Sequence, residues 1–445
     1  MARLFGTDGV RGVANTELTC DLAFKLGQAA VAFQGKTILI GKDTRLSGDM
    51  LEAAVSAGIM SMGGTALLAG IIPTPAIAYL VRELHCDGGI VISASHNPPE
   101  YNGIKLFDAQ GFKLPDAVED EIEAFVKAGG AAAEDLPAGD AVGVALPVDD
   151  ASELYIAHAV STVADEGIDL AGLKVALDVG HGASALTSAE ALRRLGADVT
   201  AINEEFDGTD INVECGSTHL GPVQELVARI GADVGIAHDG DADRVMLVDA
   251  EGNVIDGDMV EAVCAIDLHK RGLLPGGTAV STVMCNLGLT HAMRDAGIEL
   301  IQTKVGDRYV LEAMREGGFV LGGEQSGHMI FLEHNSTGDG LVTALQFLAA
   351  CKRAGATAAE AASVMTRFPQ TLINVKVRDK HALDGNAEIA AAVEAAEAEL
   401  GENGRVLIRP SGTEPVVRVM VEAPDEPTAN RHAQAIAQVV ESALA

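Results

Sequence analysis

Three carboxylates spaced two residues apart give the strongest chemical signal in the sequence. Asp239, Asp241 and Asp243 lie in the polar run His238–Arg244, which has an apolar segment on each side. A turn between two strands can bring three carboxylate oxygens onto one hard cation, and Mg²⁺ typically shares such ligands with a phosphate. A calcium-binding EF-hand is excluded, because the run lacks the central glycine and the final carboxylate of that loop. We therefore expect a Mg²⁺ site, with a solvated acidic turn as the alternative.

A serine at the end of an apolar segment is the second signal. The segment Gly88–Ile92 leads into Ser93–Pro98, in which Ser95 stands beside His96. Ligands bind at the carboxyl ends of strands in open α/β sheets, so this serine can accept or hold a phosphoryl group. An ordinary Asn-Pro turn is the alternative. A Ser/His hydrolase is disfavoured because its GxSxG motif is absent.

The run Arg409–Pro415 has the composition of a phosphate-binding loop. Ser411, Gly412 and Thr413 are expected in a tight turn that exposes backbone N–H groups and hydroxyls, and Arg418 follows on the next strand. Backbone nests bind phosphate oxygens, and guanidinium groups bind them in a bidentate manner. The alternative is an ordinary hairpin loop.

Further glycine-rich loops carry polar or cationic side chains. In the run Gly322–Gly327, Glu324 and Ser326 can reach sugar hydroxyls with little obstruction from neighbouring side chains. Three more such loops contain cationic side chains: Gly6–Gly12, Gly41–Arg45 and Thr303–Arg308. These cations could bind an anionic ligand, but cationic side chains more often lie at the protein surface, and that is the expectation here.

The composition restricts the classes of partner. The chain has 445 residues, with 31 Lys and Arg against 64 Asp and Glu, so its formal net charge is −33. That charge, together with a content of only 3% aromatic residues, argues against binding of nucleic acid. Six cysteines without a CxxC pair predict a reduced, cytoplasmic protein. No signal peptide and no long apolar span are visible, so we expect no membrane contact.

Short apolar strands alternate with helices along most of the chain, which indicates α/β layers with mostly parallel sheets. The alternation starts with helix 18–33, strand 37–40 and helix 47–62, and it restarts near residues 173 and 258. After about residue 368, three strands and two helices have the pattern of a small α+β domain. We therefore expect four domains: 1–150 with the Ser95 loop, 151–252 with the three aspartates, 253–367 with the Glu324 loop, and 368–445 with the Arg409 loop.

Five motifs, in this order along nearly the whole chain, resemble the α-D-phosphohexomutase family: Phe5–Gly12, Ser93–Pro98, Asp239–Arg244, Gly323–His328 and Arg409–Glu414. The resemblance implies three similar mixed α/β domains and a smaller α+β C-terminal domain around a central cleft. It also implies an isomerase, an intramolecular phosphotransferase that uses Mg²⁺ and a phosphorylated serine. More narrowly, the motifs are similar to those of bacterial members that interconvert glucosamine 6-phosphate and glucosamine 1-phosphate. That reaction passes through glucosamine 1,6-bisphosphate, on the route to UDP-N-acetylglucosamine and peptidoglycan.

The resemblance assigns a role to each matching position. Ser95 is implied to be the phosphoserine and to bind Mg²⁺ together with Asp239, Asp241 and Asp243. Four further residues are implied to be catalytic, through proton transfer or contact with the transferring phosphoryl group: Arg11, Lys105, Arg244 and His328. Seven are implied to bind the substrate, the first two through sugar hydroxyls and the others through the phosphate that is not reacting: Glu324, Ser326, Arg409, Ser411, Gly412, Thr413 and Arg418.

Other functions stay open at this point. A phosphomannomutase or phosphoglucomutase of the same family would differ in the sugar, and the amino-sugar preference is inferred chiefly from Gln325 and the segment Lys304–Tyr309. A phosphatase would hydrolyse phospho-Ser95 with water, and a sugar-phosphate sensor would bind without turnover. A homodimer is implied by the resemblance alone. The first phosphorylation of Ser95, by a kinase, by the bisphosphate or by autophosphorylation, is left open.

Overall fold

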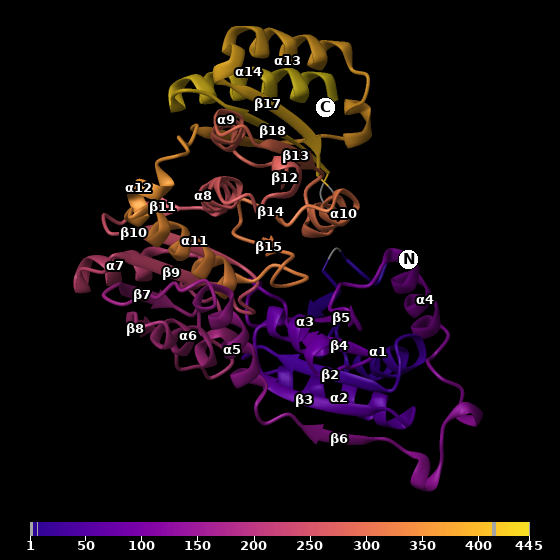
Figure 1. Ribbon diagram of the computed structural model, residues 1–445. Helices are drawn as coiled ribbons and strands as arrows, with labels where there is room; N and C mark the ends of the chain where they lie inside the picture. Colours follow the sequence, from indigo (N-terminus) through magenta and orange to yellow (C-terminus); the bar gives the residue numbers. More distant parts are fainter. Residues whose placement is uncertain (1–2, 7, 412–414, 445) are drawn as a thin grey trace. The chain divides into compact units, whose positions relative to one another are not determined.

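The computed structural model describes residues 3–6, 8–411 and 415–444 of the chain. Most of its helices and strands are labelled in Figure 1. They divide into two compact units, the first with residues 1–284 and 297–364 and the second with residues 285–296 and 365–445. No helix among the described residues is long and apolar enough to cross a membrane.

The first sheet of the larger unit has six strands in the spatial order β1 (Val10–Val13), β5 (Tyr101–Asp108), β4 (Gly88–Ile92), β2 (Thr37–Lys42), β3 (Thr65–Ile71) and β6 (Val144–Pro147). The four strands from β4 to β6 pair in parallel, whereas β5 and β1 are antiparallel to their neighbours. Four helices belong to this part of the chain: α1 (Cys20–Phe33), α2 (Gly48–Ser61), α3 (Thr74–Glu83) and α4 (Asp116–Lys127). Leu26 of α1, Val55 of α2 and Ile40 of β2 lie fully buried in one shared core.

Local sequence signals explain where these elements begin. The Thr19 hydroxyl accepts a hydrogen bond from the Leu22 N–H at 3.3 Å and so caps the first turn of α1. The apolar stretch near residues 69–81 divides into β3 and α3. Pro75 lies in the first turn of α3, where a helix has no partner for the N–H that proline lacks.

The stretch 128–150, at the end of the first expected domain, contains a strand of the sheet. It has two short 3₁₀ turns, Ala133–Asp135 and Gly139–Ala141, followed by β6, which pairs in parallel with β3. All four residues of β6 are exposed, so no alternation of buried and exposed side chains marks the strand in the sequence. Its pairing is a backbone property that the pattern of side chains did not reveal.

The second sheet has five strands in the order β11 (Val254–Ile255), β10 (Val245–Asp249), β9 (Val234–His238), β7 (Lys174–Asp178) and β8 (Asp198–Ile202). The strands β9, β7 and β8 are parallel, and β10 is antiparallel to both β9 and β11. The helices of this part are α5 (Ala151–Ala164), α6 (Ser188–Arg194) and α7 (Gly221–Ile230), with 3₁₀ turns at Ala183–Leu186 and Gly216–Thr218. The strands expected on either side of the three aspartates are therefore confirmed.

The third sheet has four strands in the order β13 (Glu299–Thr303), β12 (Thr278–Thr282), β14 (Leu321–Gly323) and β15 (Met329–Phe331). The first three are parallel, and β15 is antiparallel to β14. The helices of this part are α8 (Gly257–Lys270), α10 (Asp307–Gly317), α11 (Gly340–Ala354) and α12 (Ala358–Ala362), with a 3₁₀ turn at Pro275–Gly277. All three sheets thus combine parallel strands with an antiparallel neighbour, and this confirms the expectation of three similar mixed α/β domains.

The smaller unit contains an antiparallel sheet with the order β16 (Gln370–Lys376), β18 (Val416–Glu422) and β17 (Arg405–Pro410). Its helices are α9 (Leu287–Asp295), α13 (Ala387–Leu400) and α14 (Glu426–Leu444), with 3₁₀ turns at Lys380–Leu383 and Gly401–Asn403. Val417, Val419 and Val421 of β18 lie fully buried in its core. The small α+β domain is confirmed, and α9 joins it although α9 follows β12 in the chain.

Candidate active site

Three loops with chemically active side chains occupy equivalent places in the three sheets of the larger unit. Loop 93–100 joins β4 to β5, loop 239–244 joins β9 to β10, and loop 324–328 joins β14 to β15. In each case the first strand belongs to the parallel part of its sheet and the second is its antiparallel neighbour. The similarity of the three folds therefore extends to the position of the loops.

Ser95 and Asp239 bring two of these loops together. The Ser95 Oγ donates a hydrogen bond to Asp239 Oδ2 at 2.6 Å and lies 3.3 Å from Nδ1 of His96. Ser95 is buried, and its backbone adopts a positive φ of 52°. This left-handed conformation is uncommon for a residue other than glycine and often accompanies a functional role.

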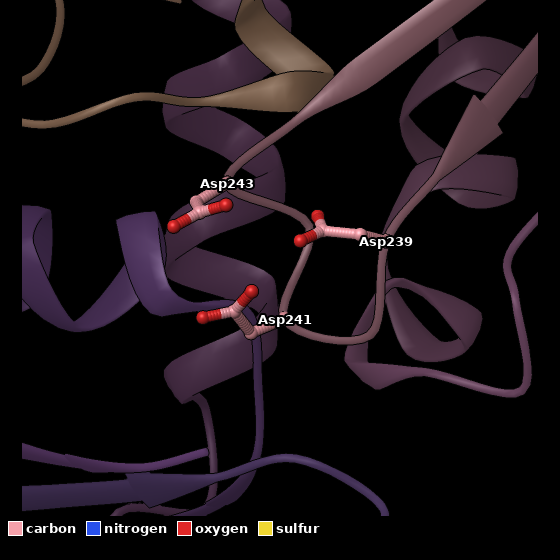
Figure 2. Close-up of side chains that lie close together, drawn as sticks. All are labelled: Asp239, Asp241 and Asp243. Carbon is pink, nitrogen blue, oxygen red and sulfur yellow. The ribbon is translucent and has the colours of Figure 1, made fainter. Parts of the chain in front are cut away.

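The three aspartates expected to bind a metal lie around a common point (Figure 2). Each is buried, and one oxygen of each lies within 4.8 Å of the others. Burial, followed by the charges of Asp243 and Asp241, raises the pKa of Asp239 well above its usual value. The Oδ1 atoms of Asp241 and Asp243 are buried and accept no hydrogen bond from the described residues. A hard cation would satisfy these oxygens and relieve the repulsion, so the three aspartates can hold a metal ion.

Lys105 of β5 lies against the metal-binding loop. Its Nζ is 2.8 Å from Asp241 Oδ2 and 3.7 Å from Asp243 Oδ2, and the side chain is buried. Burial alone would raise the pKa of Asp241, but the Lys105 ammonium group and the Thr74 hydroxyl, at 2.6 Å, hold that pKa well below its usual value. Lys105 is therefore a fixed, charged neighbour of the expected metal ligands.

Asp8 connects Arg11 to the same cluster. Its Oδ2 pairs with Arg11 and lies 3.0 Å from Lys105 Nζ, and its Oδ1 lies 2.6 Å from Lys113 Nζ. Lys113 also pairs with Asp307 Oδ2 at 2.5 Å. Although burial would raise the pKa of Asp8, the surrounding cations hold it well below the usual value. Arg11 thus reaches the cluster through Asp8.

Arg244 and His328 complete the residues expected to be catalytic. Arg244 Nη1 donates to His96 Nδ1 at 3.2 Å, and Arg244 Nε lies 3.9 Å from Asp243 Oδ1. Burial and the nearby Arg244 lower the pKa of His96, which keeps the ring neutral as an acceptor. His328 is buried with Nε2 at 4.0 Å from Asp243 Oδ2 and 3.8 Å from Asp307 Oδ2. Neither ring nitrogen of His328 has a hydrogen-bond partner in the described part of the chain.

A glycine lets the loop with Glu324 and Ser326 lie closely against the start of β10, directly after the three aspartates. Gly327 has a φ of +89°, and a Cβ atom there would lie 2.1 Å from the carbonyl oxygen of Val245. Glu324 is half-buried and accepts a hydrogen bond from the Gly306 N–H at 3.2 Å, while Ser326 is exposed. Gln325 donates through Nε2 to Asp258 Oδ2 at 3.1 Å, so its amide is engaged with α8.

The expected phosphate-binding residues lie in the smaller unit. Arg409 and Arg418 are directly opposite each other on β17 and β18, and burial together with Arg418 lowers the pKa of Arg409. Ser411 is buried, its N–H donates to Val416 O at 2.9 Å, and its carbonyl oxygen accepts from Lys380 Nζ at 2.6 Å. Gly412 and Thr413 fall outside the described residues.

The structure adds residues that sequence reasoning did not single out. Asp8, Arg45 and Asp307 stand in the cation-bearing glycine-rich loops, where the cations were expected at the surface, but these three are largely or fully buried. Thr74 and Lys113 belong to no such motif. The clustering of glycine with charged residues was therefore the available signal for the first three, whereas the last two reach the site only through the fold.

Four domain models of one family match the chain in succession. They are described as phosphoglucomutase/phosphomannomutase α/β/α domain I at residues 2–133, domain II at 153–252, domain III at 256–368, and the C-terminal domain at 372–439.

The chain is also similar over its full length to individual proteins of this family. A phosphoglucosamine mutase from Clostridium novyi (strain NT) is 51% identical over 450 residues, covering 99% of both chains. The solved structure of a phosphoglucomutase/phosphomannomutase family protein from Burkholderia thailandensis is similar with a TM-score of 0.82, at 24% identity, and covers 100% of this chain and 98% of its own. The Aspergillus fumigatus N-acetylphosphoglucosamine mutase, solved with GlcNAc-6P and magnesium, has a TM-score of 0.69 at 18% identity, covering 99% and 96%. At these identities the two structures establish the likeness of fold.

Proposed function

The chain belongs to the phosphoglucomutase/phosphomannomutase family, and from that membership we propose that it is a phosphoglucosamine mutase. It interconverts glucosamine 6-phosphate and glucosamine 1-phosphate and is an isomerase. The observation that carries the proposal is the hydrogen bond of 2.6 Å between Ser95 Oγ and Asp239, one of three buried aspartates that can hold a metal ion. This arrangement suits a serine that carries a phosphoryl group beside a divalent cation.

Phospho-Ser95 transfers its phosphoryl group to the free hydroxyl of the bound sugar phosphate. The bond between phosphorus and Ser95 Oγ breaks and Oγ takes up a proton, while a bond between phosphorus and the sugar oxygen forms and the sugar hydroxyl proton passes to a base. The product is glucosamine 1,6-bisphosphate. After the intermediate turns round, the phosphoryl group at its other end returns to Ser95 Oγ, which gives up its proton, and the released sugar oxygen takes up a proton.

The aspartates and their cationic neighbours supply the electrostatics of this transfer. Asp239, Asp241 and Asp243 would hold Mg²⁺, which would neutralise charge on the phosphoryl group. Arg244, with its guanidinium group beside Asp243 and His96, is placed to contact phosphoryl oxygens. Lys105 stabilises negative charge that develops near Asp241.

Proton transfer falls to a residue near the transferring group. His328 is suited to it, because its ring nitrogens are buried without a hydrogen-bond partner among the described residues. Lys105 and Arg11 are the other candidates. Both are held by carboxylates, Lys105 by Asp241 and Arg11 by Asp8, and these contacts favour their charged forms.

Substrate recognition is divided between two loops. Glu324 and Ser326 bind sugar hydroxyls, since one is half-buried and the other exposed beside the metal-binding loop. The phosphate that does not react is bound by Arg409, Ser411, Gly412, Thr413 and Arg418. Facing guanidinium groups on adjacent strands favour a phosphate dianion between them.

The four domains span 1–150, 151–252, 253–367 and 368–445. The protein acts in the cytoplasm as a homodimer, and Ser95 receives its first phosphoryl group from the bisphosphate, a kinase or autophosphorylation.

The purified protein, with Mg²⁺ and a trace of the matching sugar bisphosphate, tests the proposal. Glucosamine 6-phosphate and glucose 6-phosphate are followed in parallel by phosphorus NMR. Faster appearance of glucosamine 1-phosphate supports the proposal. Faster conversion of the glucose compound overturns the choice of sugar but leaves the mutase chemistry. Steady release of inorganic phosphate from either sugar contradicts the mutase and indicates a phosphatase.

A further inference from the structure

We propose that Arg45 is a positioning residue that sets the conformation of the loop carrying Ser95. The inference rests on the proposed phosphoryl transfer through Ser95. Arg45 belongs to the run Gly41–Arg45, whose cation was expected at the surface, yet its side chain is completely buried. Its side-chain hydrogen bonds go to Asp43 and to carbonyl groups of the serine loop, so its influence on the three aspartates passes through the backbone of that loop.

Every N–H donor of the Arg45 side chain is used inside the protein. Nε donates to Asp43 Oδ2 at 3.0 Å. Nη1 donates to the carbonyl oxygens of Pro98 and Tyr101, at 2.5 and 3.0 Å, and Nη2 donates to those of Ser95 and Asn97, at 3.0 and 2.7 Å. A guanidinium group has five N–H donors, so none is left for a phosphate. Arg45 therefore organises the loop and does not bind the phosphoryl group.

The same network holds the N–H of Ser95. Asp43 Oδ2 accepts a hydrogen bond from Ser93 Oγ at 2.5 Å, and Ser93 Oγ accepts one from the Ser95 N–H at 2.9 Å. Arg45 thus contacts the Ser95 carbonyl directly and reaches the Ser95 N–H through Asp43 and Ser93. Both backbone polar groups of Ser95 are fixed by one buried ion pair.

These hydrogen bonds to the Ser95 backbone matter because Ser95 has an unfavourable backbone conformation. A positive φ is unfavourable for a residue with a Cβ atom, so surrounding contacts must maintain it. The conformation directs Oγ to Asp239 at 2.6 Å. Asn212, from the second sheet's part of the unit, adds a hydrogen bond from Nδ2 to the Ser95 carbonyl at 2.9 Å. Loss of the Arg45 contacts would let the loop relax and move Oγ away from the phosphoryl donor.

The test is the rate at which glucosamine 1,6-bisphosphate phosphorylates Ser95 in a single turnover, followed by intact mass. Arg45→Lys keeps the charge beside Asp43 but cannot supply the five donors. We expect a rate about 100-fold below that of the unmodified protein, because a displacement near 1 Å costs about that factor. The KM for glucosamine 6-phosphate should stay within about threefold, since Arg45 does not touch substrate.

Arg353→Lys is the matched control. Arg353 pairs with Asp267 and Glu166 at 2.8 Å each, away from the serine loop, so its loss removes a similar network without moving Ser95. Asn212→Ala provides a milder variant should Arg45→Lys fold poorly, with a smaller fall in the same rate. Arg45→Lys with an unchanged phosphorylation rate and a lowered melting temperature would make Arg45 merely structural and overturn the proposal. If the unmodified protein is not phosphorylated at Ser95, the proposed function itself fails.

Discussion

Lys105 Nζ lies 2.8 Å from Asp241 Oδ2, and both side chains are buried. The contact belongs to a continuous series of ion pairs in which Lys105 also contacts Asp8, Asp8 contacts Lys113, and Lys113 contacts Asp307. Each buried charge in this series is compensated by an opposite one, as burial requires. The series joins residues that are far apart in the chain and holds the loop with the three aspartates against β5.

Replacing Lys105 by Met should destabilise the protein by about 3–5 kcal/mol, because Asp241 then stays buried without its cation and Asp8 loses one of its cations. Urea unfolding of the metal-free protein at neutral pH measures the change. Lys25→Met, which removes an i,i+4 pair with the exposed Asp21, is the control and should cost less than about 0.5 kcal/mol. Equal losses for the two variants would contradict a role of the buried pair.

Asp307 should make stability depend on pH. Burial raises its pKa, but Lys113 outweighs burial and holds that pKa below the usual value. A carboxyl group with a lowered pKa in the folded state contributes stability that is present above its unfolded pKa, about 4, and lost as the pH falls through the folded value. Asp307→Asn should therefore cost about 2 kcal/mol at pH 7, and the difference from the unmodified protein should shrink below about pH 4. Urea midpoints at several pH values give both quantities. A difference that does not vary with pH would contradict this assignment.

Ser95→Ala should abolish turnover, with kcat at least about 1,000-fold lower, because no other residue takes the phosphoryl group. The Kd for glucosamine 6-phosphate should change by less than about threefold, since Ser95 contributes its hydroxyl and not a sugar contact. Calorimetric titration beside the turnover assay separates the two effects. Near-normal turnover of this variant would exclude Ser95 as the nucleophile.

Mg²⁺ should stabilise the protein through the three aspartates. At a metal concentration 100 times the Kd, binding to the folded state alone adds about 2.7 kcal/mol. A chelator should abolish activity and lower the melting temperature, and added Mg²⁺ should restore both. In Asp243→Asn the Mg²⁺-dependent rise in melting temperature should be largely lost, because one of the three buried ligands is removed. An unchanged rise in that variant would exclude Asp243 as a ligand.

The sequence predicted the helices and strands well, but it predicted the contacts between residues far apart in the chain less well. The strand predicted at residues 37–40, which the structure has at Thr37–Lys42, stands out because its apolar residues are a local signal. The cluster of three aspartates was predictable because all three lie within five residues of the sequence. Lys113 was not, since its role arises from Asp8 and Asp307, which lie 105 and 194 residues away. The burial of Arg45 was not predictable either, because it depends on four carbonyl groups that lie at least 50 residues later in the chain. Such contacts depend on the tertiary fold, which brings residues far apart in the chain together.

The pair Arg409 and Arg418 should bind the phosphate that does not react. The two residues are opposite each other on β17 and β18, and the positive charge of Arg418 helps to lower the pKa of Arg409, so an anion between them relieves repulsion. Arg418→Met should reduce kcat/KM about 10- to 100-fold, because a charge-assisted hydrogen bond contributes about 1.5–3 kcal/mol. The loss should appear mainly in KM, and inorganic phosphate should protect the variant from thermal unfolding less than it protects the unmodified protein. Arg431→Met is the control, since Arg431 pairs with Glu399 on the surface of the same unit and should leave kcat/KM unchanged. Unaltered phosphate protection in Arg418→Met would place the phosphate site elsewhere in the protein.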